Sequence, residues 1–378
     1  MRIAIDASNI RTGGGLNHLF QILKNFDSKI LKVEKIYIWA SINTIKQLPL
    51  KKEIVYIDVT KYVDSTLGYM FWQVFMFKSE IKKTNCDILF VPGGLYLGLF
   101  RPYYAMAQNL LPFDKKERSR YKFSLTYFRY LILNKLQKYT FYKAEGTIFL
   151  TRFSMKIIKN NQYSKENKKD VVIYHGVDEG FFNYDRKYVN LKSSNRTINL
   201  LYVSIINYYK NHLNVLEALD QLIDNGYKIN LNLVGPIYKP AYNAVKKKIE
   251  YSSNLKNNVI IYNEVEYIEL KNFYNNADIF VFASSCETFG MIVLEAMAAG
   301  LPIACSEMSS MKEIIDNNCE YFNPKDSISI FKAIEVLIHD FDRCKLLGQS
   351  ARESAKRYTW EKCTNQTFNY LTKSKNKQ

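Results

Sequence analysis

Two glutamates, Glu287 and Glu295, are separated by seven residues that include Gly290 and an apolar run. The preceding residues, 278–283, are apolar and bounded by polar residues, which predicts a buried strand. After Gly290 the pattern is helical until the Gly-Leu-Pro sequence at 300–302 ends it. Glu287 is therefore expected at the carboxyl end of a strand and Glu295 about one turn into a helix. Both acids and several backbone amides would then face one small volume, which suits a polyhydroxylated, phosphorylated ligand.

The N-terminus of this predicted helix attracts anions through its N–H groups and the helix dipole, whereas a carboxylate repels phosphate. We therefore predict that the glutamates accept hydrogen bonds from sugar hydroxyls and that the phosphates meet the backbone amides near Phe289, Gly290 and Met291. For an arbitrary pair of acids at this spacing, a helix-capping glutamate and a surface glutamate would be the better interpretation. The strand, glycine turn and small-residue helix around this pair favour a binding site instead.

The segment from Cys286 to Gly300 resembles the signature of the retaining glycosyltransferases of family four, which have the GT-B fold. This resemblance implies an α/β protein with two Rossmann-like domains that face each other across a deep interdomain cleft. It implies that Glu287 contacts the donor sugar and that Glu295 contacts the nucleotide ribose. It also implies a metal-independent enzyme without a cofactor, whose co-substrate is a nucleotide-diphosphate sugar.

Three consecutive glycines, 13–15, follow a predicted strand at 2–6 and precede a helix expected to begin near Leu16. Glycines entering a helix let the backbone approach a phosphate without a Cβ in the way. The spacing is not that of a dinucleotide-binding loop, and no lysine and hydroxyl follow as in a nucleotide-hydrolysing loop. The triplet alone is more typical of a flexible turn. It resembles the family's loop that meets the diphosphate, which would assign Gly14 and Gly15 to donor binding.

Lys210 follows a predicted strand at 199–204 and opens the next helix. A lysine at the mouth of a parallel sheet can neutralise a diphosphate leaving group as the glycosidic bond breaks. Lys210 and Glu287 are therefore the predicted catalytic residues. The family pattern has an arginine where this chain has Ser204, which leaves one cation fewer at the phosphate. His212 is expected to be a first-turn helix residue rather than a catalyst.

Gln108 and Asn109 follow a predicted strand at 103–107, where many family members carry a histidine. Both amides can hydrogen bond to sugar or acceptor hydroxyls, but neither can move a proton near neutral pH. This fits a retaining mechanism in which the departing phosphate oxygen takes the acceptor proton, as is proposed for the family. A double displacement would need a nucleophilic carboxylate near the anomeric carbon, for which the sequence offers no assured candidate. We interpret His175 as a loop residue at the domain junction.

The chain of 378 residues exceeds the usual size of a single core and predicts two domains. Strands alternate with helices, which implies parallel sheets that bind ligands at the carboxyl ends of their strands. We place an N-terminal, acceptor-side domain at 1–185 and a C-terminal, donor-binding domain at 186–358. The resemblance implies that the final helix, within 359–378, packs back on the first domain.

The six cysteines are scattered without a C-x-x-C pair, and the four histidines do not cluster with acids. This pattern indicates a reducing compartment and predicts no metal site. We expect no signal peptide, because the first predicted strand begins at residue 2. The longest apolar run, 88–100, is too short to span a bilayer. We expect a cytoplasmic protein, and a peripheral position at the inner face of the cytoplasmic membrane stays open.

The net charge of +17 includes nine lysines and arginines against three acids between residues 114 and 145, interleaved with aromatic residues. Such a stretch can lie on anionic lipid, where each cation contributes about 1 kcal/mol. It can equally be a solvated helix whose aromatic face packs inside its own domain. The apolar segment 62–77 is either an acceptor groove or, as the safer interpretation, core. Nucleic acid is not an expected partner, since no recognition motif is present.

We therefore predict a retaining hexosyltransferase that moves a sugar from a UDP- or GDP-linked donor to a carbohydrate hydroxyl. The expected acceptor is a lipid-linked glycan for surface polysaccharide, that is, O-antigen, capsule or lipopolysaccharide. Two alternatives remain open. A non-catalytic GT-B scaffold subunit of a polysaccharide-assembly complex is suggested by Ser204 and Gln108, and a nucleotide-sugar 2-epimerase would release a free sugar without an acceptor.

Overall fold

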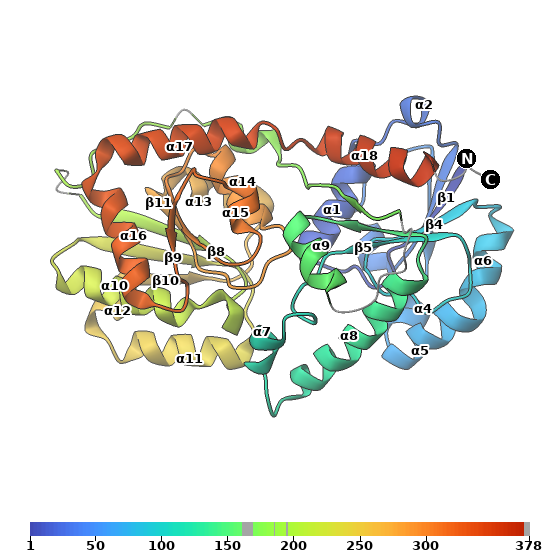
Figure 1. The fold of residues 1–378 in the computed structure, drawn as a ribbon, viewed down its shortest axis with the longest axis horizontal. Helices are drawn as coiled ribbons and strands as arrows, with labels where there is room; N and C mark the ends of the chain where they lie inside the picture. The colour runs from blue at the N-terminus through green and yellow to red at the C-terminus, as the bar shows by residue number, and fades with distance from the viewer. Residues whose placement is uncertain (161–168, 185, 194–195, 374–378) are drawn as a thin grey trace. The chain divides into compact units, whose positions relative to one another are not determined.

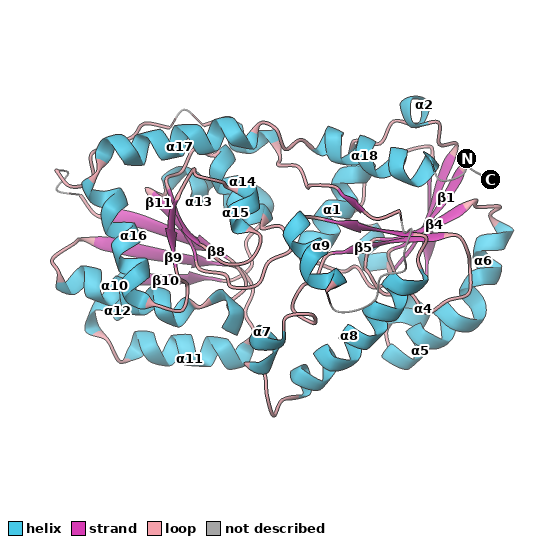
Figure 2. Cartoon of the chain, in the orientation of Figure 1, coloured by secondary structure: helices cyan, strands magenta, loops and turns pink. Residues whose placement is uncertain are grey.

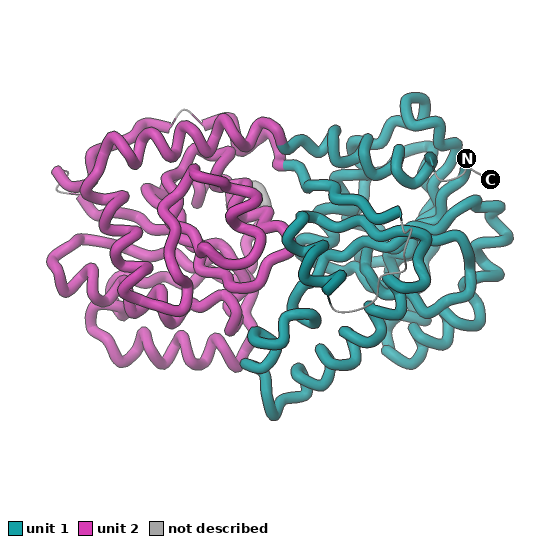
Figure 3. The backbone as a smooth tube through the Cα atoms, in the orientation of Figure 1, with its two compact units in different colours: residues 1–176, 358–378 teal, residues 177–357 magenta. Residues whose placement is uncertain are grey.

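The computed structural model describes residues 1–160, 169–184, 186–193 and 196–373. The chain forms two compact units (Figure 3). Unit 1 contains residues 1–176 and 358–378, and unit 2 contains residues 177–357. In each unit the strands lie between layers of helices (Figure 2).

Unit 1 is built on a parallel sheet with the strand order β3-β2-β1-β4-β5-β6-β7. Its central strands are buried on both faces, which explains why they read as continuous apolar runs. The strands are β1 (Arg2–Asp6), β2 (Lys35–Ala40), β3 (Ile54–Asp58), β4 (Ile88–Val91), β5 (Tyr103–Ala107), β6 (Gly146–Phe149) and β7 (Val171–Val172). The helices are α1 (Gly13–Lys24), α2 (Ser28–Leu31), α3 (Ile42–Ile45), α4 (Thr60–Val63), α5 (Thr66–Phe71), the π-helical turn Trp72–Met76, α6 (Phe77–Lys83), α7 (Lys115–Ser119), α8 (Leu125–Lys143), α9 (Arg152–Lys159) and α18 (Trp360–Lys373).

Unit 2 is built on a second parallel sheet with the order β10-β9-β8-β11-β12-β13. The strands are β8 (Ile198–Val203), β9 (Ile229–Val234), β10 (Val259–Tyr262), β11 (Ile279–Phe282), β12 (Ile303–Ser306) and β13 (Glu320–Phe322). The helices are α10 (His212–Asp224), α11 (Lys239–Glu250), α12 (Ser253–Asn258), α13 (Tyr267–Asn276), α14 (Met291–Ala298), α15 (Met311–Ile314), α16 (Ser327–His339) and α17 (Phe341–Ala355), with 3₁₀ turns at Glu179–Phe182 and Tyr208–Lys210.

Both sheets reverse their strand order at one point. In unit 1 the chain runs outward through β1, β2 and β3 and then returns to place β4 beside β1. In unit 2 it runs through β8, β9 and β10 and returns to place β11 beside β8. Ligands of open parallel sheets bind at the carboxyl ends of the strands at such a reversal. The β1/β4 and β8/β11 junctions are therefore the places at which a site is expected in each unit (Figure 1).

The glycine triplet belongs to a helix rather than to a loop before it. The sequence predicts that the first helix begins near Leu16, but α1 begins at Gly13. Gly13 has φ +69°, a left-handed conformation that glycine adopts without steric cost. The extended backbone of Thr12 therefore passes into a helix within one residue.

The division between the units lies between Gly176 and Val177, whereas the sequence places it at 185. Just beyond the sequence-based boundary, the Arg186 guanidinium donates to main-chain carbonyls at the carboxyl ends of α13 and α14. Tyr188 also donates to the carbonyl of Gly300, at 2.8 Å. These side chains satisfy helix-end carbonyls, which attaches residues 186–188 to unit 2.

The final helix, α18, belongs to unit 1 and packs against α1 (Figure 1). The ring of Phe368 lies 4.9 Å from that of Phe26, between centroids. In the segment 62–77, Trp72 is core and stacks on Phe77 at 4.3 Å, while neighbouring aromatic rings of the same segment are exposed. No helix among the described residues is both long and apolar enough to cross a membrane.

Candidate active site

Lys210 and Glu287 meet at the β8/β11 junction of unit 2. The Lys210 ammonium forms an ion pair with Oε1 of Glu287, and the two side chains are only 6% and 16% exposed. The Ser284 hydroxyl donates to the same carboxylate oxygen at 2.6 Å. The ammonium also lies 4.9 Å from the centre of the Phe282 ring. Removing either partner would leave a charge in a mostly desolvated position, which is strongly destabilising.

The turn that carries Lys210 is attached to the loop after β11. Tyr208–Lys210 forms a 3₁₀ turn, and Asn211 follows in the left-handed conformation with φ 51°. The Asn211 amide donates to the carbonyl of Ala283 at 2.8 Å. The backbone N–H of Ser285 donates to the carbonyl of Tyr209, also at 2.8 Å. These bonds connect segments more than 70 residues apart and hold the lysine in place.

The backbone of Glu287 is held by the loop after β12. The Ser309 hydroxyl accepts from the N–H of Glu287 at 2.6 Å and donates to its carbonyl at 2.8 Å. Gly290 then adopts φ +89°, and a Cβ at this position would lie 2.6 Å from Cε of Met311. Helix α14 begins at the next residue, Met291, without a side-chain cap. Phe289 is buried in the turn between Glu287 and the helix.

Glu295 lies in the middle of α14 and is 7% exposed. The Tyr274 hydroxyl donates to its Oε2 at 2.9 Å. Burial raises the pKa of Glu295 to about 7, and the hydrogen bond from Tyr274 opposes this shift. The group can therefore either accept or donate a hydrogen bond near neutral pH.

Ser204, which directly follows β8, and His212, at the start of α10, lie next to each other at the same junction. The Ser204 hydroxyl lies 3.2 Å from Nε2 of His212, and the imidazole stacks on Tyr202 at 4.7 Å. Burial, with the nearby charge of Lys210, lowers the pKa of His212 to about 3. The imidazole is neutral at physiological pH, and His212 is the first residue of α10.

Several residues that build this site are not predicted from the sequence. Gly235 has φ +138°, and a Cβ there would lie 2.5 Å from the carbonyl oxygen of Ser204. Ser284, Ser309 and Tyr274 hold the two glutamates, as described above. A usable signal exists for Gly235, which directly follows the buried strand β9, and for Ser284, which lies two residues after the buried strand β11. Tyr274 has no such signal, since its role follows from tertiary packing.

In unit 1 the structure brings Gly15 and Gln108 together. Gly14 and Gly15 lie in the first turn of α1, and Gln108 directly follows β5. The Gln108 Oε1 lies 3.5 Å from the position that a Cβ of Gly15 would occupy, and its Nε2 donates to the carbonyl of Pro92 at 3.1 Å. Asn109 accepts from a backbone N–H of its own turn.

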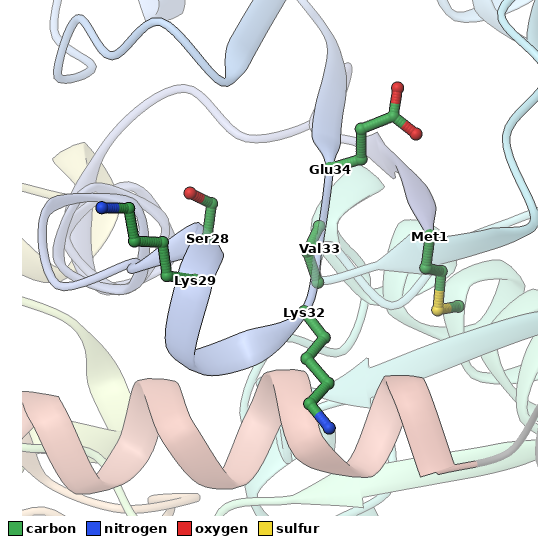
Figure 4. Close-up of a pocket in the computed structure, with 6 residues that line it drawn as sticks. All are labelled: Met1, Ser28, Lys29, Lys32, Val33 and Glu34. Carbon is green, nitrogen blue, oxygen red and sulfur yellow. The ribbon is translucent and has the colours of Figure 1, made fainter.

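Unit 1 also contains a buried acid, Asp6, at the carboxyl end of β1. Its carboxylate accepts from the Gln73 amide at 2.6 Å and from the N–H of Ser8 at 3.1 Å. Burial raises the pKa of Asp6 to about 6. An open hollow of about 310 Å³ lies elsewhere in this unit and is lined by residues 1, 28–29 and 32–34 (Figure 4). None of the predicted site residues lines it.

Most of unit 2, which holds this site, is similar to a known protein family. Residues 186–354 match the family described as glycosyl transferases group 1. Over 101 residues the chain is 33% identical to O-antigen chain mannosyltransferase B of Escherichia coli. The matched region covers 27% of this chain and 26% of that protein. Over 266 residues it is 24% identical to the capsular polysaccharide biosynthesis glycosyltransferase CapM of Staphylococcus aureus, covering 66% and 68%.

The whole chain is similar in structure to Anabaena HepE, solved in complex with UDP-glucose. The TM-score is 0.74 at 15% sequence identity, with 99% of this chain and 100% of that chain covered. The fold is therefore GT-B, with two parallel α/β sheets, as the sequence predicts. The chain spans between about a fifth and about two thirds of the length of the first curated relatives that it matches.

Proposed function

We propose that this chain, in which residues 186–354 match the glycosyl transferases group 1 and which has the GT-B fold, is a retaining, metal-independent glycosyltransferase. The co-substrate is a nucleotide-diphosphate sugar and the acceptor is a carbohydrate hydroxyl. The observation that carries this proposal is the buried Lys210–Glu287 pair at the β8/β11 junction. A mobile, solvated lysine would have to be ordered during the reaction, whereas this one is already held.

Lys210 is proposed to stabilise the leaving group. Charge accumulates on the diphosphate as its bond to the sugar breaks, and a preorganised cation is worth most where charge develops in a desolvated site. Without donor, Glu287 neutralises the ammonium. With donor bound, the diphosphate shares the ammonium, and Glu287 accepts hydrogen bonds from the sugar hydroxyls.

The remaining donor contacts are assigned to the start of α14 and to Glu295. The backbone near Phe289, Gly290 and Met291 is at the N-terminus of a helix, where a phosphate is favoured. Glu295 lies farther along this helix and is proposed to bind the ribose. In unit 1, Gly14 and Gly15 are proposed to meet the diphosphate.

Retention of configuration follows from a step within the donor and acceptor themselves. The bond between the anomeric carbon and the phosphate oxygen breaks, and the acceptor oxygen bonds to the same face of the sugar. The acceptor proton passes to the departing phosphate oxygen. Gln108 and Asn109 are the acceptor-side candidates and would orient hydroxyls, since an amide does not transfer protons near neutral pH.

We propose UDP-hexose as the first donor to test and surface polysaccharide as the product class. HepE was solved with UDP-glucose, and named relatives of this chain make O-antigen and capsule. A GDP-linked donor is the second choice, because one relative is a mannosyltransferase. The acceptor would be a lipid-linked glycan, and the enzyme would work in the cytoplasm at the inner face of the membrane.

The surface of residues 114–145 supports a position at the membrane. At the start of α8, Phe123 is fully exposed and Leu125 is 89% exposed, and Lys122 and Arg129 are exposed beside them in the sequence. Exposed apolar and basic side chains together favour an anionic lipid surface. Cosedimentation with anionic vesicles should fall in the double variant Phe123→Ser, Leu125→Ser, and binding equal to the wild type would reject this surface.

The decisive experiment combines nucleotide binding and transfer. Thermal unfolding of the full chain is measured with UDP, GDP and their sugar conjugates, and donor turnover is measured with a glycan acceptor. A ligand at about 100 times its Kd stabilises by roughly 2.7 kcal/mol. We expect one nucleotide class to stabilise the wild type and Glu295→Ala to lose the response. If no nucleotide stabilises the protein, the scaffold alternative replaces the enzyme, and acceptor-independent release of a new sugar would identify an epimerase.

A further inference from the structure

Unit 1 contains a buried cluster of two histidines and a cysteine that the proposed reaction does not use. His18 lies on α1, His175 lies just before the chain leaves for unit 2, and Cys363 lies on α18. Their exposed fractions are 0%, 3% and 1%. The two Nδ1 atoms of the histidines are 3.0 Å apart, and one candidate ligand atom from each of the three residues lies within 4.8 Å of the others.

These side chains form a ligand set that suits zinc. Imidazole nitrogen and cysteine sulfur are the common protein ligands of Zn²⁺, at about 2.0 and 2.3 Å, so neighbouring ligand atoms on a tetrahedron are roughly 3.3–3.8 Å apart. The Nδ1 atoms, 3.0 Å apart, are slightly closer than this range, and all three candidate ligand atoms lie within 4.8 Å of one another. The residues converge from positions 18, 175 and 363, which is why a search for ligand spacing along the sequence predicts no metal site.

The cluster also contains a polar atom that the protein does not satisfy. Nε2 of His18 is buried without a hydrogen-bond partner among the described residues. Buried polar groups normally have partners, and each exception calls for an explanation such as a bound ion.

We propose that Zn²⁺ binds between α1, the 171–176 segment and α18, with His18, His175 and Cys363 as ligands. The three protein ligands leave one tetrahedral position for a water molecule. Binding displaces the proton of the Cys363 thiol, which passes to solvent, and the imidazoles bind in their neutral form. This ion takes no part in the transfer reaction.

The location of the site suggests what the ion does. The chain leaves unit 1 after Gly176 and returns at Tyr358, so His175 and Cys363 stand beside the two crossings. The crossings touch each other, because a Cβ on Gly176 would lie 2.2 Å from the backbone nitrogen of Trp360. His18 is about one turn beyond the glycines at the start of α1. The ion would fix both crossings to α1, whose first turn contains the glycines that are proposed to meet the diphosphate.

The test uses the untagged full chain after removal of metals with a chelator. Zn²⁺ is titrated against a chromogenic chelator, and Co²⁺ is added separately as a spectroscopic probe. We expect one ion per chain, a cobalt spectrum with thiolate charge-transfer absorption, and a rise of a few degrees in the melting temperature with Zn²⁺. Cys363→Ala should abolish the thiolate band, and His18→Gln should weaken Zn²⁺ binding at least tenfold.

Cys344→Ala is the matched control, since Cys344 is also a buried free cysteine but lies in unit 2. It should bind Zn²⁺ like the wild type. Absence of stoichiometric binding by the wild type overturns the proposal whether or not the variants fold. So does a cobalt spectrum without thiolate absorption, or equal Zn²⁺ affinity in folded Cys363→Ala. Nucleotide binding by the metal-free protein is measured in parallel, so that failure here is distinguished from failure of the glycosyltransferase proposal.

Discussion

The carboxyl edges of the two sheets share a strand topology but differ in chemistry. Beside β8 and β11, unit 2 places a largely buried ion pair and a buried acid, Glu295. Beside β1 and β5, unit 1 places the neutral amides of Gln108 and Asn109, and its buried acid, Asp6, is occupied by hydrogen bonds within the unit. Topology thus sets where a ligand can bind, whereas the residues after the strands decide whether charge or neutral hydrogen bonds meet it.

The largest effect is expected from Lys210→Ala, which removes the charge that distinguishes the unit 2 edge. Transfer should fall by about 10² to 10³, the loss typical of one preorganised group that stabilises developing charge. Glu287 would also be left without its cation, so stability should decrease by about 3 kcal/mol. Transfer kinetics and urea unfolding measure the two losses separately.

Two further variants separate charge from stability. Lys312→Ala removes an exposed lysine of unit 2 from its ion pair with Glu307 and should change neither quantity noticeably. The double variant Lys210→Met, Glu287→Leu should recover much of the lost stability and none of the transfer. Transfer close to the wild-type rate in Lys210→Ala would remove the leaving-group role.

The second effect concerns pH and the buried acids of the two units. Burial raises the pKa of Glu295 to about 7 from 4.5, so the folded protein holds a proton that the unfolded chain has released. The contribution of Glu295 to the free energy of unfolding is therefore fully present below its unfolded pKa of 4.5, and it is lost as pH rises through about 7. At most about 3 kcal/mol is lost in this window. Urea unfolding between pH 4 and pH 8 should show the decrease, and Glu295→Gln should abolish its upper part.

Asp6→Asn is the counterpart in unit 1. The pKa of Asp6 is raised to about 6 from 3.8, so its contribution has the same sign but is lost at lower pH. Asp6→Asn should abolish the decrease between about pH 4 and pH 6 and leave the upper part in place. A Glu295→Gln profile that still falls like the wild type between pH 6 and pH 8 would contradict the assignment.

A smaller effect is expected from two glycines at helix starts, Gly13 at the first residue of α1 and Gly290 just before α14. Gly13 and Gly290 both have positive φ, but only Gly290 has a neighbour, Met311, where a Cβ would stand. Alanine at a left-handed position costs about 1–2 kcal/mol. Gly290→Ala should therefore destabilise more than Gly13→Ala in thermal unfolding. Equal losses would show that the end of the Met311 side chain moves aside freely.

The smallest effect is expected at the neutral edge of unit 1. Gln108→Ala removes an amide that is proposed to orient the acceptor, and we expect a several-fold higher KM for the acceptor with an unchanged KM for the donor. The net value of one such hydrogen bond is about 1 kcal/mol. A change in the donor KM instead would assign Gln108, which lies beside Gly15, to the diphosphate.

Local patterns along the sequence predict the strands well. Apolar runs place β1 and β5 at the residues that the structure shows, and β11 within one residue at each end. The GT-B fold is also predicted, because the motif after β11 is specific. The start of α1 is predicted wrongly, since a glycine triplet is compatible with both a loop and a helical turn.

Contacts between distant segments could not be predicted from those patterns. Separate patterns along the sequence identify Lys210 and Glu287 and assign them to phosphate and sugar. Their ion pair depends on β8 and β11 being neighbours across an intervening excursion through β9 and β10. The same reason conceals the cluster of His18, His175 and Cys363, whose members come from α1, the 171–176 segment and α18 and meet only in the folded unit.

The chain completes unit 1 only after it has completed unit 2, which affects the order in which the units can fold during synthesis. A nascent chain that has emerged through residue 357 contains all of unit 2, while unit 1 still lacks α18. The side of α1 that packs against α18, and Phe26 just after α1, which contacts Phe368, stay uncovered until then. Unit 2 can therefore fold on the ribosome before unit 1 is complete, although its residues are translated after most of unit 1.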